Sequence, residues 1–131
     1  MPEMTKQRPK HLALHEIRLP LAGFASILHR VSGAGLFLLL PLLIWLLQLS
    51  LGSTQGSAET FAAVTGNWLV KLILLGLMWA FFHHFCMGIR ILLIDIHVGV
   101  EKQQAHSSAM AVMVISLLLT AIFGLKLLGA Y

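Results

Sequence analysis

The sequence predicts an all-α integral membrane protein with three transmembrane helices. Of its 131 residues, 58% are apolar and 11% are charged, whereas roughly a quarter of the residues in a soluble domain are charged. Three long segments carry very little charge, and each is long enough to cross a hydrocarbon core of about 30 Å. Together these observations exclude a water-soluble globule. A channel or transporter piece, a membrane redox subunit and an inert anchor remain as classes of function.

Cysteine and charge exclude further classes. The single cysteine, Cys86, rules out an internal disulfide and a zinc site built from cysteines. The net charge of +4 is small and scattered, so we expect no binding to nucleic acid. Residues 1–25 form a basic N-terminal segment that lacks the apolar stretch of a signal peptide, so we expect no cleaved presequence.

The first transmembrane helix is expected at residues 26–51. Residues 31–51 contain no charge, and these 21 residues, at about 1.5 Å of rise each, are just long enough to span the hydrocarbon core. Pro41 lies inside this segment and predicts a kink, which neighbouring helices in a membrane can tolerate. Residues 52–67 are rich in Gly, Ser, Thr and Ala, so we expect an external loop with at most a short surface helix.

Two further spans follow, at residues 68–94 and 108–128, joined by a polar loop at 95–107. Three helices enclose little interior, so we expect them to form part of a hetero-subunit helical bundle. The distribution of Lys and Arg predicts the orientation, because basic residues favour the cytoplasmic side. On the side of the N-terminus are Lys6, Arg8, Lys10, Arg18, Arg30, Arg90 and Lys102. On the opposite side are Lys71 and Lys126. The N-terminus is therefore expected to be cytoplasmic.

A first polar cluster lies where the first helix begins. Ser26 and Arg30 are four residues apart and share one helix face, and Gly33 opens space next along that face. A hydroxyl, a guanidinium group and a gap beside them are suited to a ligand that bears a carbonyl group. The alternative is that Arg30 only anchors the helix at the headgroups and Ser26 bonds its own backbone.

A second cluster lies in the second helix. His84 and Gly88 share one face, so an imidazole stands one turn from a missing side chain, which suits a flat macrocycle such as haem b. The cations at a suitable depth for its propionates are Arg90, His29 and Arg30. The alternative is a buried histidine that bonds a neighbouring helix. His83 points about 100° away from His84, and we expect a structural or partner-facing role for it.

Asp95 falls at the end of the second helix, close in depth to Arg30. Pairing of the two side chains is one hypothesis. The other is that Asp95 delivers protons from water to a quinone, a ligand with carbonyl groups, bound nearby. The loop residues His97, Glu101 and His106 are expected to be solvated.

Read together, these residues resemble the large cytochrome b membrane-anchor subunits of succinate dehydrogenase, complex II. The resemblance extends over nearly the whole chain, with three spans in the same order. The matching elements in the first half are Arg8-Pro9, Ile17-Arg18, Pro20 and Ser26-Ile27-Leu28-His29-Arg30-Val31-Ser32-Gly33. Those in the second half are His84, Gly88-Ile89-Arg90 and Asp95.

The resemblance implies roles for individual residues. Ser26 and Arg30 match positions that line the ubiquinone pocket of the family, and His84 matches the axial ligand of haem b. His29 and Arg30 match residues near the haem propionates, and Asp95 matches the acid that closes the second motif. The chain departs from the family where a histidine commonly follows the arginine of that motif, because Ile91 stands there.

The resemblance also implies partners. A six-coordinate haem needs two axial ligands and this chain offers one well-placed imidazole, so the second is expected from the smaller anchor subunit. The iron–sulfur and flavoprotein subunits would dock on the cytoplasmic side of the bacterial inner membrane, and this chain would not itself oxidise succinate. The alternatives are a fumarate reductase anchor, a small transporter subunit and a scaffold without haem. The transporter is disfavoured because residues 35–48 offer no polar path.

Overall fold

The structure, a computed structural model, describes residues 14–129. Within this range the chain forms a short 3-10 helix, η1 (Leu14–Glu16), and five α-helices, and it contains no strand. Three of the α-helices are long and apolar enough to cross a membrane, which confirms the all-α membrane class. Lys6, Arg8, Lys10 and the Arg8-Pro9 element lie outside the described residues, as does most of the expected N-terminal segment 1–25.

The segment expected to be one transmembrane helix is divided into two, α1 (Leu21–Leu38) and α2 (Leu40–Leu51). The division lies at Leu39, whose φ of −98° and ψ of 5° leave the helical region. Pro41 causes it, because proline has no N–H to donate and its ring clashes with the carbonyl of residue 37. The expected kink therefore lies at Leu39, two residues before the proline, and Leu39 still donates its N–H to Gly35 and accepts from Leu43.

The helix α1 also begins earlier than expected. Its first residue is Leu21, whereas the sequence placed the start of the span at residue 26. Pro20 occupies the N-cap with a φ of −65° and a ψ of 154°, which places the extended N-terminal segment before the first helical turn. The polar residues of the first cluster consequently lie well inside a helix.

The region expected to be an external loop with at most a short surface helix contains a helix of 12 residues, α3 (Gln55–Gly66). The hydroxyl of Thr54 caps it by accepting a hydrogen bond of 3.2 Å from the backbone N–H of Ser57. The Gly and Ser content suggested a loop, whereas this N-cap and the alanines that follow favour a helix.

Two long helices complete the chain, α4 (Trp68–Asp95) and α5 (Lys102–Leu127). Asn67 caps α4, because its Oδ1 accepts a hydrogen bond of 2.9 Å from the N–H of Leu69. The helix α5 begins six residues before the expected start at 108, so it takes up much of the segment expected as a polar loop. Its first turns are polar and exposed, and helical backbone is stable there because water solvates the side chains.

A tight turn joins α4 to α5. The N–H of His97 donates to the carbonyl of Ile94, and the N–H of Val98 donates to that of Leu93, both at 2.9 Å. This is the Schellman arrangement, which needs a left-handed residue after the helix, and here that residue is His97 with a φ of 62°. Gly99, with a φ of 76°, supplies the second left-handed position of the turn.

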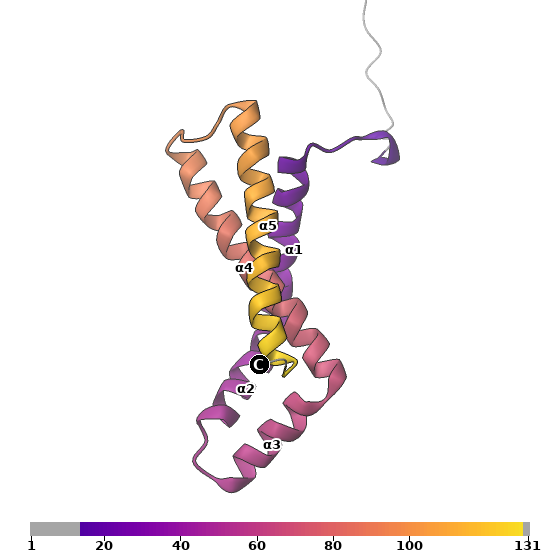
Figure 1. The fold of residues 1–131 in the computed structure, drawn as a ribbon, viewed down its shortest axis with the longest axis vertical. Coiled ribbons are helices and arrows are strands. Elements are labelled where there is room, and N and C mark those ends of the chain that lie inside the picture. Colours follow the sequence, from indigo (N-terminus) through magenta and orange to yellow (C-terminus); the bar gives the residue numbers. More distant parts are fainter. Residues whose placement is uncertain (1–13, 130–131) are drawn as a thin grey trace, which may run out of the picture.

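The helices α1, α4 and α5 pack into one bundle, and α2 and α3 diverge below it as a separate V (Figure 1). The centre of the bundle is narrow and consists largely of small side chains. The buried apolar residues that contact one another there are Ala25, Met87, Ala109 and Val112. Most large apolar side chains lie on the outer faces, as expected when the surrounding solvent is lipid.

Candidate functional site

The two polar clusters, far apart in sequence, meet where α1 packs against α4. Gly33 of α1 faces His84 of α4 so closely that a Cβ atom at position 33 would lie 2.8 Å from Cε1 of His84. Real Cβ atoms do not approach other heavy atoms to this distance. The missing side chain at Gly33 therefore makes the space for the imidazole of His84, a relationship that the sequence did not reveal.

The backbone of α1 orients this imidazole through a hydrogen bond. Nδ1 of His84 lies 3.1 Å from the carbonyl oxygen of His29 and 3.4 Å from Oγ of Ser32. Ser32 donates its own proton to the same carbonyl at 2.9 Å, so its oxygen accepts from His84. Since a carbonyl oxygen can only accept, Nδ1 of His84 is the donor of this hydrogen bond. The other ring nitrogen, Nε2, is then the atom through which the neutral ring could bind a metal.

The ring of His84 is also held in orientation. It stacks on the ring of His29, with ring centroids 4.1 Å apart and planes 19° from parallel. One turn further along α4, a Cβ atom at Gly88 would meet nothing within 4 Å. His84 is thus oriented by a hydrogen bond and by ring stacking, and the helix face beyond it is open enough for a flat ligand.

Ser26 and Arg30 lie on α1 with their polar groups uncommitted. Ser26 is half-buried and Arg30 is exposed, and neither side chain forms a hydrogen bond or ion pair with residues 14–129. The alternative that Ser26 bonds its own helix is not seen, although Ser32 and Ser50 do so. A hydroxyl and a guanidinium group with free donors remain available to a ligand.

Arg90 does not serve as a cation for the face of His84, which corrects the sequence expectation. Its side chain is buried against α5, where Nε donates to Oγ of Ser108 at 2.9 Å and Nη2 donates to the carbonyl of Ala105 at 3.1 Å. Arg90 follows His84 by six residues, which turns it to another side of the helix. It joins α4 to α5, and a charge so deeply buried needs these partners.

His83 is structural rather than partner-facing as seen from this chain. Its side chain is completely buried, with Nε2 3.3 Å from the carbonyl oxygen of Ala25. The ring stacks on Trp79, with ring centroids 5.2 Å apart. His83 thus fastens α4 to α1 one residue before His84.

Asp95 stands at the exposed end of α4 and makes no ion pair with Arg30 or with any other residue that the structure describes. The proposed pairing of these two side chains is therefore absent within the chain. The loop residues His97, Glu101 and His106 are exposed, as the sequence suggested. Within residues 14–129, no three His, Cys, Asp or Glu side chains converge as a metal site would require.

Comparisons with known proteins match this chain over almost its full length. A family described as the succinate dehydrogenase/fumarate reductase transmembrane subunit matches residues 4–123. A succinate dehydrogenase cytochrome b556 subunit from Paracoccus denitrificans is 36% identical over 115 residues, which cover 88% of this chain and 88% of that protein. The subunit of the same name from Rickettsia felis is 33% identical and covers 90% of this chain and 91% of its own length. That from Coxiella burnetii is 30% identical and covers 92% and 97%.

Proposed function

Because the chain belongs to the succinate dehydrogenase/fumarate reductase transmembrane subunit family, as a cytochrome b anchor subunit of succinate dehydrogenase, we propose that it binds haem b and helps to form the ubiquinone-reduction site. The observation that supports haem binding best is the hydrogen bond from Nδ1 of His84 to the carbonyl of His29. Metal-binding histidines in proteins almost always donate their second ring N–H in this way.

The residues around His84 fit a haem group. His84 would bind the iron through Nε2, while the His29 carbonyl and the space at Gly33 hold the ring in place. Arg30, whose guanidinium group has no partner in the described part of the chain, would pair with a propionate beside His29. When bound, haem supplies an iron centre that takes up and releases single electrons.

The second axial ligand would come from a partner. Within residues 14–129 no second histidine faces His84 from another helix in a position to share an iron, since His29 stacks on the ring itself. We assign that ligand to a second, smaller anchor subunit, so that haem b lies between the two chains. With a cytoplasmic N-terminus in the bacterial inner membrane, as the basic residues favour, the iron–sulfur and flavoprotein subunits would dock on the side of the loop between α4 and α5.

Ser26 and Arg30 would hold ubiquinone by donating hydrogen bonds to a carbonyl oxygen of the quinone ring. Reduction of the quinone to the quinol consumes two electrons, which arrive from the iron–sulfur subunit, and two protons. Asp95 is exposed to water at the end of α4 and would supply protons from that side. This chain binds and orients the quinone, and succinate is oxidised elsewhere in the complex.

A fumarate reductase anchor is the second candidate, because the matching family includes both enzymes. The relatives with the quoted identities are named as succinate dehydrogenase subunits, which favours succinate oxidation. A transporter or a scaffold without haem would not need the hydrogen bond and the ring stacking that orient His84.

A visible absorption spectrum of the purified membrane complex tests the haem assignment. We expect a b-type signal that is lost in His84→Ala and kept in His106→Ala, a control that changes an exposed histidine on α5. An undiminished signal in His84→Ala would disprove the ligand assignment. A parent complex without any haem signal would instead favour the scaffold or the transporter.

A further inference from the structure

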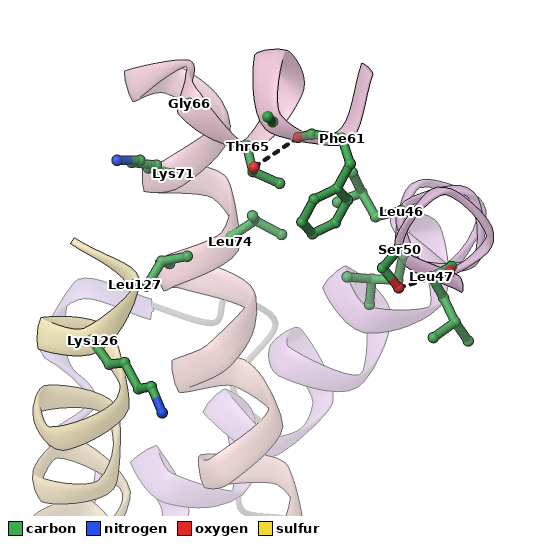
Figure 2. A pocket seen from close by; sticks show the side chains of 12 residues that line it. Leu46, Leu47, Ser50, Phe61, Thr65, Gly66, Lys71, Leu74, Lys126 and Leu127 are labelled. Carbon is green, nitrogen blue, oxygen red and sulfur yellow. Dashed lines mark hydrogen bonds between the residues drawn. The ribbon is translucent and has the colours of Figure 1, made fainter. Parts of the chain in front are cut away.

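A cavity lies at the end of the bundle where α4 begins. There α2, α3, α4 and α5 surround a trough of about 660 Å³, within the range of about 300–1,000 Å³ typical of ligand sites. Side chains from α2, α3 and α4, among them Leu46, Phe61 and Leu74, converge on its centre (Figure 2). Most of the lining residues are apolar, so the trough is suited to a hydrocarbon chain.

The charged residues of the trough are two lysines. Lys71 of α4 and Lys126 of α5 lie on the same side of it (Figure 2), and no Asp or Glu is among the lining residues. Neither amine forms a hydrogen bond or an ion pair with the residues that the structure describes. The other Lys and Arg residues in 14–129 lie toward the opposite end of the bundle. Both cations of this end therefore border one cavity and lack an anion.

The hydroxyl groups of the trough do not compete with the lysines for an anion. Ser50 donates its proton to the carbonyl of Leu47 at 2.8 Å, and Thr65 donates to that of Phe61 at 2.7 Å. Their hydroxyl oxygens then have only lone pairs left, which cannot donate to a negative group. An anion bound here would be held by the two amines.

The trough lies at the depth where headgroups meet hydrocarbon. Trp68 is exposed at the first residue of α4, and tryptophan is enriched at membrane interfaces. Lys71 is one turn further on, and Lys126 lies in the last turn of α5. Lysines at such helix ends reach the interface with their amines while their stems lie along apolar surface.

We propose that this trough binds a phospholipid of net negative charge, with an acyl chain along the apolar wall and its phosphate bound by Lys71 and Lys126, whose long side chains would turn toward it from the outward orientations seen in Figure 2. The two amines favour a lipid of negative charge over an apolar helix of a partner subunit, because such a helix would leave both charges beside the trough without an anion. The lipid would fill the space between the V formed by α2 and α3 and the ends of α4 and α5.

Lipid retention by the purified complex tests the charge requirement. The complex is exchanged into detergent micelles that contain phosphatidylglycerol or phosphatidylcholine, and bound lipid is counted by native mass spectrometry. We expect the parent to retain phosphatidylglycerol over phosphatidylcholine and the double variant K71Q/K126Q to lose about tenfold in retention. Lys102→Gln removes an exposed lysine at the start of α5, and we expect full retention. Retention by K71Q/K126Q equal to that of the parent would overturn the proposal.

A second pair of variants tests the trough itself. Ala62 and Ala63 are both exposed on α3, and Ala62 lines the trough whereas Ala63 does not. Ala62→Trp should displace the lipid although both lysines remain, and Ala63→Trp should not. The visible spectrum of each variant reports whether the complex is folded, independently of lipid. A photoreactive residue at position 62 should label added phosphatidylglycerol, and labelling of a partner subunit instead would overturn the proposal.

Discussion

Gly33 and His84 form one packing unit, because the imidazole of His84 occupies the space that a side chain at Gly33 would fill. The carbonyl of His29, one turn earlier on α1, accepts the Nδ1 proton of the same ring. Helix α1 thus determines the position and the plane of a histidine that belongs to α4. The residues that hold the His84 side chain in place therefore come from a different helix than His84 itself.

Gly33→Ala should disturb the haem site although it adds only one methyl group. The new Cβ atom would push the imidazole of His84 away from the His29 carbonyl, and we expect a several-fold fall in haem content of the purified complex, measured by its b-type absorption. Gly35→Ala on the same helix is the matched control, since a Cβ there meets nothing within 4 Å. Equal spectra for the two variants would contradict the packing argument.

Arg30→Ala should impair quinone reduction. A charge-assisted hydrogen bond contributes about 1.5–3 kcal/mol, so we expect a loss of about tenfold or more in succinate-driven reduction of ubiquinone. Reduction of a soluble dye by succinate should stay close to the parent level, because it bypasses this site. A parallel loss of both activities would mean that the variant fails to assemble and would remove support for a quinone contact.

Ser108→Ala should destabilise the pairing of α4 with α5. The substitution leaves Nε of the buried Arg90 without its partner, at a cost of about 1–3 kcal/mol. We expect a lower Tm for the purified complex in a thermal melt. Ser107→Ala, which removes an exposed hydroxyl without a hydrogen bond in the described range, should leave the Tm unchanged.

His97 is the position where a glycine should stabilise the chain. The residue has a φ of 62°, a left-handed conformation that costs a non-glycine residue roughly 1–2 kcal/mol. We expect the Tm of the complex to rise slightly in His97→Gly and to fall in His97→Val, whose branched side chain tolerates this conformation least. The opposite order would show that contacts of the imidazole outweigh the backbone strain.

The fold class could be predicted from the sequence because long apolar segments have few other solutions in lipid. The positions of helix ends and of short helices were harder to predict from the sequence. Pro41 predicted a kink, but not its position. The helix α1 ends at Leu38 because the proline ring clashes with the preceding turn. For α3 the sequence predicted at most a short surface helix, because the Gly and Ser residues of this segment outweighed the N-cap signal of Thr54.

The sequence could predict the candidate site only where the spacing of residues within one helix places them on the same face. The i, i+4 spacing places Ser26 and Arg30 on one face without any knowledge of the neighbouring helices. Contacts between helices are invisible to that reasoning, so Arg90 was assigned to the haem face although it bonds Ser108 on α5. The role of Gly33 was likewise misplaced, because only the packing of α1 against α4 brings it to His84.

The interruption at Leu39 has a mechanical consequence for the membrane in which the chain resides. Hydrophobic mismatch between a helix and its bilayer is relieved by tilting, at a fraction of a kcal/mol per Å. Because the helix axis changes direction at Leu39, we expect α2 to adjust its tilt more readily than α1 when the bilayer thickens or thins. The register of His29 and Gly33 against His84 would then depend little on lipid composition.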